Sequence, residues 1–175
     1  DDVKPTPAQL DAAPDIPAQQ QADLIKGTTI PASLAERARQ LTLGTTSKHE
    51  AAVAIQDWLR TFTYSTNVIS EPIDDLQSSS YLEQFIQDKV GYCEQFAATM
   101  ALMSRSIGIP ARVVVGFTRG TKNDQGEYVG TAKDAHAWPE LFFTGIGWVR
   151  FEPTPRGPVD TTSRKFVLCL VRSTI

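Results

Sequence analysis

The stretch that decides the fold is Gly91-Tyr92-Cys93-Glu94-Gln95-Phe96-Ala97, because a glycine is followed at once by the start of a helical pattern. Behind Cys93, apolar residues recur at the spacing of one buried helix face. They are Phe96, Met100, Met103 and Ile107. Gly108 and Pro110 end the pattern, since glycine accepts a left-handed turn and proline cannot continue a helix. We therefore predict a core helix with a cysteine at its amino terminus.

The residues after this helix have the composition of β-strands. β-branched and aromatic residues are frequent in 112–118, 135–143 and 148–152, which we predict to be three strands. The polar segment 119–133 is expected to be a loop or a hairpin, and 144–147 a turn.

Helical patterns precede Gly91. The segment 31–44 carries one apolar stripe, and a second stripe follows the capping-box pattern Ser47-Lys48-His49-Glu50. The second stripe consists of Ala51, Ile55, Trp58, Leu59 and Phe62. A shorter helix is expected around 82–86. Helices first and antiparallel strands afterwards indicate an α+β fold, with helices packed on an antiparallel sheet.

The composition excludes several classes of protein. The net charge is -3 and the pI about 5.4, which gives no electrostatic footprint for nucleic acid. The chain has two cysteines and two histidines, too scattered for a zinc site, and no acidic cluster suited to calcium. We therefore expect no metal and no cofactor. No run of about 20 apolar residues is present, so no complete membrane span is expected.

The chain is expected to have three segments. Residues 1–30 are rich in proline, alanine, glutamine and aspartate, which predicts an arm or linker. Residues 31–160 form the folded domain. Residues 161–175 are a tail, which is a final strand, the stub of a removed segment or an artificial extension. Because both ends are abrupt, we expect a piece of a longer protein.

A cysteine at a helix amino terminus has two chemical advantages. The unpaired N–H groups and the helix dipole favour a thiolate at Cys93. The same groups can stabilise the oxyanion that forms when a thiolate attacks a carbonyl, so the backbone N–H of Cys93 is an expected oxyanion donor. The alternative is a small buried core residue, which free cysteines often are.

His136 is the candidate base for this thiol. Side chains alternate along a strand, so His136 shares a face with Trp138, Glu140 and Phe142. The indole of Trp138 would supply a low-dielectric wall, which strengthens an imidazole–thiolate pair. Taken alone, a strand histidine could equally be a hydrogen-bonded structural residue.

Glu152 is the candidate third member, and its reach depends on strand register. A two-residue turn would point Glu152 away from His136. A three-residue connection would pair Phe143 with Gly147, which places Glu152 opposite Trp138 and diagonal to His136, roughly 7–8 Å away at the backbone. We therefore predict an odd-length connection or a bulge. Otherwise Glu152 is a solvated strand end, and Asp134 is the reserve residue for orienting His136.

Four stretches together resemble a transglutaminase-like domain, over roughly Ser47 to Pro155. They are GYCEQFA at 91–97, LMSRSIGIPARVVVGF at 102–117, DAHAWPE at 134–140 and GWVRFEPTP at 147–155. The resemblance implies a papain-like core with Cys93 as nucleophile and His136 as base. The third member in this family is usually aspartate, and Glu152 stands at that place here.

The resemblance also implies the reaction, which is acyl transfer through a thioester. The acyl donor would be a glutamine side-chain amide or a peptide bond, and the products of crosslinking, deamidation and proteolysis all remain open. Tyr64 would be a second oxyanion donor unless it is simply a core or strand tyrosine. Trp138 and Tyr92 would form the wall of the site. The calcium gating of animal transglutaminases is not implied.

The first motif is most similar to bacterial membrane proteins that hold such a domain outside the cytoplasmic membrane. This similarity implies an extracytoplasmic domain of a membrane-anchored parent protein that acts on protein or peptide substrates of the cell envelope. The alternative is a non-catalytic module on the same scaffold that binds peptide or wall polymer. A redox thiol is the weaker third possibility, because no motif links Cys169 to Cys93.

Overall fold

The computed structural model describes residues 5–26, 29–66, 79–118, 120–131 and 134–155. The helices are α1 (Pro7–Asp11), α2 (Ala18–Ile25), α3 (Ala32–Leu41), α4 (Lys48–Leu59), α5 (Ser79–Asp88) and α6 (Cys93–Ser106). The strands are β1 (Thr63–Tyr64), β2 (Val90–Gly91), β3 (Ala111–Phe117), β4 (Thr121–Lys122), β5 (Tyr128–Val129), β6 (Ala135–Phe143) and β7 (Gly147–Arg150). The α+β class is confirmed. The predicted tail, 161–175, lies outside the described residues.

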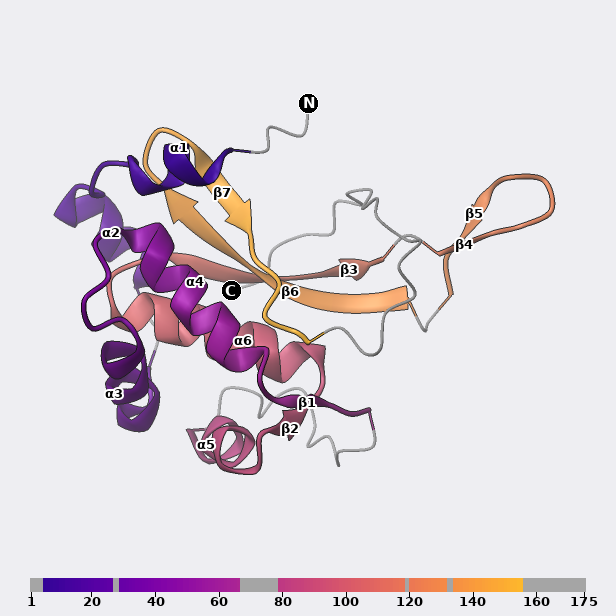
Figure 1. Ribbon diagram of the computed structural model, residues 1–175, viewed down its shortest axis with the longest axis horizontal. Helices are drawn as coiled ribbons and strands as arrows, with labels where there is room; N and C mark the ends of the chain where they lie inside the picture. The colour runs from indigo at the N-terminus through magenta and orange to yellow at the C-terminus, as the bar shows by residue number, and fades with distance from the viewer. Residues whose placement is uncertain (1–4, 27–28, 67–78, 119, 132–133, 156–175) are drawn as a thin grey trace.

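The main sheet consists of β3, β6 and β7 in that order, and both strand pairs are antiparallel. Helix α6 packs on one face of this sheet, and α3 and α4 pack against α6 (Figure 1). Helix α4 also reaches the sheet, because the His49 ring lies 6.4 Å from the Phe143 ring of β6. The hairpin β4–β5 projects from the end of the molecule that lies away from α1, α2 and α3 (Figure 1). It falls within 119–133, the segment predicted to be a loop or a hairpin. Helix α6 therefore packs against both the other helices and the sheet.

The connection between β6 and β7 has the predicted odd length. Phe143 pairs with Gly147, so three residues join the strands. Gly145 and Gly147 have positive φ angles of 79° and 102°, which glycine adopts without steric cost. The third strand is shorter than predicted, because ladder pairing ends at Arg150 rather than at 152.

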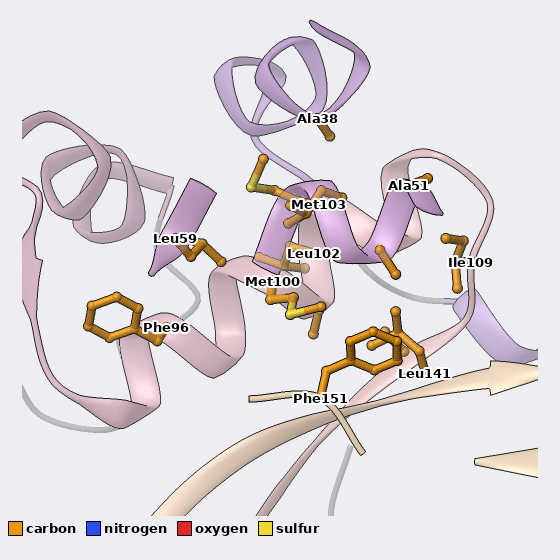
Figure 2. Close-up of a cluster of buried hydrophobic side chains, with 14 of the residues drawn as sticks. Ala38, Ala51, Leu59, Phe96, Met100, Leu102, Met103, Ile109, Leu141 and Phe151 are labelled. Atoms are coloured by element: carbon orange, nitrogen blue, oxygen red, sulfur yellow. The ribbon is translucent and has the colours of Figure 1, made fainter. Parts of the chain in front are cut away.

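The core is built around α6, whose side chains pack in two directions (Figure 2). Phe96, Met100 and Met103 are fully buried in its central stretch. Helices α3 and α4 cover one side, and the sheet with Phe151 covers the other. The predicted stripe of α4 is confirmed. Trp58 lies at the edge of this stripe and is only partly buried. Its ring packs edge-on against the Phe62 ring, with the ring centroids 4.8 Å apart.

The capping-box pattern before α4 is only half realised. The Ser47 hydroxyl accepts the Glu50 N–H at 3.0 Å, as predicted for an N-cap. The Glu50 carboxylate turns mainly to Thr46, accepting its N–H at 2.6 Å and its hydroxyl at 2.8 Å. The sequence pattern alone could not distinguish two adjacent donors.

Residues 5–26 pack against the domain through α1. Leu10 is 7% exposed and belongs to the main core cluster. The carboxylate of Asp11 accepts the Ser47 hydroxyl at 2.7 Å and lies 2.8 Å from His49 Nδ1. These contacts hold α1 at the amino-terminal end of α4.

A parallel pair of short strands positions the chain just before α6. In this pair Thr63 is opposite Val90 and Tyr64 is opposite Gly91. A Cβ atom at Gly91 would meet Gln95 Oε1 and lie 2.6 Å from Cε2 of the buried Phe85 ring. Gly91 is therefore glycine because neighbouring side chains fill the space beside it.

We expect Gly91→Ala to lower the free energy of unfolding by about 1–3 kcal/mol, because the added methyl group overpacks this junction. Chemical denaturation of both proteins measures the difference. Gly130→Ala is the matched control, since a Cβ there meets nothing within 4 Å. Equal stability of Gly91→Ala and wild type would show that Phe85 and Gln95 can move aside without cost.

Candidate active site

Cys93 begins α6, as predicted. Its side chain is 8% exposed and packs with Ala97 and Ala137, so β6 lies directly against the first turn of the helix. Tyr92 has an extended backbone at the N-cap position, and its N–H donates to Gln95 Oε1 at 3.1 Å. This bond anchors the chain immediately before the thiol. The first N–H groups of α6 have no intrahelical acceptor and can serve a substrate oxygen.

His136 lies between a carboxylate and the thiol. Its Nε2 is 2.9 Å from Glu152 Oε2, and the ring also interacts with Cys93 through a hydrogen bond and electrostatically. Because Glu152 occupies Nε2, Nδ1 is the nitrogen left to face the thiol. The side chains of His136 and Glu152 are 15% and 18% exposed, so both groups are largely shielded from water.

The surroundings of His136 favour its charged form. Burial by itself would lower the pKa of the imidazole, but its hydrogen bonds to Cys93 and Glu152 and its electrostatic interactions with both groups outweigh burial and raise the pKa to about 9. Burial likewise opposes ionisation of Glu152, yet its bonds to His136 and Arg150 lower the pKa of that carboxyl below its ordinary value. The site therefore holds an imidazolium beside a carboxylate at neutral pH.

Glu152 is held by α4 rather than by sheet pairing. Its N–H donates to Gln56 Oε1 at 3.0 Å, and its carbonyl oxygen accepts from Arg60 Nε at 2.8 Å. The last backbone bond between the strands is donated by the Phe151 N–H to the Pro139 carbonyl at 3.0 Å, and these two side chains then bond the backbone of Glu152. The arrangement explains why the third strand is shorter than predicted while Glu152 still reaches His136.

Trp138 forms one wall of the site. Its indole is 3% exposed and stacks against the His136 ring, with the centroids 6.1 Å apart and the planes 29° from parallel. Tyr92 packs on the Cys93 side, and its hydroxyl lies 3.2 Å from that of Tyr81. Burial and the bond to Tyr81 raise the pKa of Tyr92, which stays neutral.

Tyr64 and Asp134 have different surroundings. Tyr64 is 41% exposed, and burial together with a smaller electrostatic effect of Cys93 raises the pKa of its phenol. Asp134, the reserve residue, instead accepts the N–H and hydroxyl of Thr131 at 2.7 and 3.0 Å. The structure thus uses the Asp134 carboxylate in a turn, while Tyr64 as an oxyanion donor stays a prediction.

Three side chains of the site were not predicted from the sequence. Arg150 donates to Glu152 Oε2 at 3.0 Å, and strand alternation could have found it, because residues 150 and 152 share a face. Gln56 and Arg60 lie more than 90 positions before Glu152 in the sequence. No local pattern connects them with residue 152.

Among the described residues, no group of three or more His, Cys, Asp or Glu side chains is arranged to hold a metal ion. None of the helices in the described part of the chain is both long and apolar enough to cross a membrane.

The model of the transglutaminase-like superfamily matches residues 35–153. The chain therefore belongs to the transglutaminase-like superfamily. It is 39% identical over 137 residues to "Uncharacterized protein YebA" of Bacillus subtilis (strain 168), an overlap of 71% of this chain and 18% of YebA. It is 40% identical over 75 residues to the protein-glutamine gamma-glutamyltransferase of Pseudomonas aeruginosa PAO1, an overlap of 42% of this chain and 11% of that enzyme.

Solved structures share the fold. The periplasmic domain of TgpA from Pseudomonas aeruginosa superposes with a TM-score of 0.65 at 24% identity, over 79% of this chain and 48% of that domain. A protein from Cytophaga hutchinsonii with the provisional name of a cysteine protease gives a TM-score of 0.57 at 20% identity, over 83% of this chain and 46% of that protein. The predicted papain-like transglutaminase fold is confirmed. The chain spans about half of these structures and less than a fifth of the two curated relatives.

Proposed function

We propose that this chain is a cysteine-dependent acyltransferase or hydrolase that forms a thioester with protein or peptide substrates. The observation that carries the proposal is the 2.9 Å contact between His136 Nε2 and Glu152 Oε2, with the thiol of Cys93 as the other partner of the ring. A nucleophile, a base and a group that orients the base are the parts that such catalysis requires.

In the acylation step, the Cys93 thiolate attacks the carbonyl carbon of a glutamine side-chain amide or a peptide bond, and a C–S bond forms. The His136 imidazolium gives its proton to the amide nitrogen as the C–N bond breaks. Ammonia or an amine leaves, and a thioester remains on Cys93. Glu152 stabilises the imidazolium before this transfer and keeps Nδ1 directed at the reacting atoms.

In the deacylation step, an amine or a water molecule attacks the thioester and gives its proton to the neutral imidazole. The C–S bond breaks, and the sulfur leaves as a thiolate beside the restored imidazolium. An amine nucleophile produces a new amide, which is a crosslink when both partners are proteins. Water produces a glutamate side chain or a cleaved peptide.

The oxyanion of each tetrahedral intermediate needs donors close to the thiol. The N–H of Cys93 is the first donor in this proposal, because it belongs to the unpaired first turn of α6. The hydroxyl of Tyr64 is the second. Its elevated pKa keeps a proton available for donation, and it lies in electrostatic range of Cys93.

We place this chemistry outside the cytoplasm, on protein or peptide substrates of the cell envelope. The support is the likeness to the periplasmic domain of TgpA and the partial identity to a protein-glutamine gamma-glutamyltransferase. A membrane-anchored parent protein is part of the same proposal. Because of the partial identity to the protein-glutamine gamma-glutamyltransferase, glutamine is the preferred acyl donor in this proposal.

We expect the chain to incorporate a fluorescent primary amine into a glutamine-containing peptide and into casein. Parallel assays measure ammonia release without amine and cleavage of a peptide library, which separates transfer, deamidation and proteolysis. Pretreatment with iodoacetamide is expected to stop each reaction, because alkylation removes the nucleophile. A chain that shows none of the three reactions yet binds peptide or wall polymer would instead be a binding module on this scaffold.

A further inference from the structure

Arg150 lies between an aromatic ring and the carboxylate of the triad. Its guanidinium carbon is 4.1 Å from the centroid of the Trp138 ring, and its Nη2 donates to Glu152 Oε2 at 3.0 Å. Trp138 also stacks on the His136 ring, and His136 in turn contacts Glu152. The four side chains therefore form a closed circuit in which each one touches the next.

Glu152 needs such support because its side chain is one methylene longer than aspartate and has an additional rotatable bond. Gln56 and Arg60 hold only its backbone. The second carboxylate oxygen, Oε1, is buried and has no hydrogen-bond partner among the described residues. The direction of the carboxylate thus depends on the two bonds at Oε2, one to His136 and one to Arg150.

We propose that Arg150 is a positioning residue, which lies flat on the Trp138 ring and holds Glu152 Oε2 toward His136 Nε2. A guanidinium suits this task, because it can stack on an aromatic face while donating in its own plane. In this role Arg150 acts through Glu152 rather than on the substrate. The inference rests on the proposed function, and it explains how glutamate can take the place that aspartate usually has.

Arg150 has two opposite effects on the pKa of His136. As a cation near the carboxylate, it weakens the attraction between Glu152 and the imidazolium, so loss of its charge alone would raise the pKa of His136. As a positioning residue, it maintains the Glu152–His136 bond, so loss of this support would lower that pKa. The other titratable group facing His136 is Cys93 of α6, which every Arg150 variant retains.

The test compares Arg150→Met with wild type by NMR titration of the His136 ring, assigned with a His49→Gln variant. We expect the His136 midpoint to fall by about one pH unit or more. We expect kcat for amine incorporation to fall roughly 10- to 100-fold with KM within about twofold, because misplaced catalytic groups slow chemistry without changing substrate contacts.

Arg112→Met is the matched control. Arg112 lies 4.3 Å over the Trp148 ring and bonds Glu140 at 2.7 Å, so it repeats the arrangement on the same sheet without touching His136 or Glu152. We expect this variant to keep the wild-type midpoint and kcat. A similar loss in both variants would overturn the proposal, because it would show a general effect on the sheet.

An unchanged or raised His136 midpoint in Arg150→Met would also overturn the proposal. If that variant does not fold, Arg150→Lys takes its place. An ammonium cannot lie on the indole and donate in plane to Oε2, so its midpoint should also fall, and a wild-type midpoint would contradict the role. If the wild type turns over no substrate, the proposed function fails, while the titration still decides the role of Arg150.

Discussion

Cys93→Ala is expected to fold like the wild type and to lose amine incorporation by at least about a thousandfold, because no other group can form the thioester. The substitution removes one sulfur atom from a cluster that otherwise contains Ala97 and Ala137, so little stability should be lost. Initial rates with a glutamine peptide and a labelled amine measure the activity. The thermal unfolding midpoint checks the fold.

Cys169→Ala is the control, because Cys169 is the other cysteine of the chain. We expect it to keep the wild-type rate and to remain sensitive to iodoacetamide. Wild-type turnover in Cys93→Ala would remove the basis for thioester chemistry. Loss of activity in both variants would mean that the measured rate depends on more than the nucleophile of α6.

Glu152→Gln is expected to lower kcat by about a hundredfold or more and to change its pH dependence, because the amide cannot stabilise the imidazolium as the carboxylate does. In the wild type the pKa of His136 is raised to about 9, so the imidazolium persists below that pH and is lost as the pH rises through it. Activity should therefore decline near pH 9. In the variant this decline should move toward the ordinary histidine value of about 6.5.

Profiles of kcat/KM between pH 5 and about 10 measure the shift, since they report the free enzyme. Asp134→Asn is the control, because the Asp134 carboxylate bonds Thr131 rather than His136. We expect it to keep the alkaline limit of the wild type. An unshifted limit in Glu152→Gln together with a shifted limit in Asp134→Asn would transfer the orienting role to Asp134.

Most of the secondary structure could be predicted from local patterns. The helix at Cys93, its end at Gly108 and the strand 135–143 follow from apolar spacing and from turn-forming residues, which act over a few positions. Parity arguments also predicted the register of Phe143 with Gly147. The end of the third strand was not predictable, because distant side chains of α4 take over the bonds of Glu152.

The candidate site was likewise predictable in part from the sequence. Cys93, His136 and Glu152 stand in motifs whose spacing already indicates their approach, while the orienting carboxylate had two candidates, Glu152 and Asp134. The structure places Glu152 on the ring and Asp134 in a turn. Both carboxylates share the parity of His136, so only the path of the chain beyond β7 could separate them.

By itself, the sequence determined the central helix, the main strands within about a residue or two, and which face of a strand each side chain takes, because steric and periodic constraints are local. Only the tertiary structure decided which groups surround the imidazole and how they shift its charge. Burial, the pairing with Glu152 and the stacking of Arg150 on Trp138 depend on atoms that are far apart in sequence and meet only when α4, α6 and the sheet pack together.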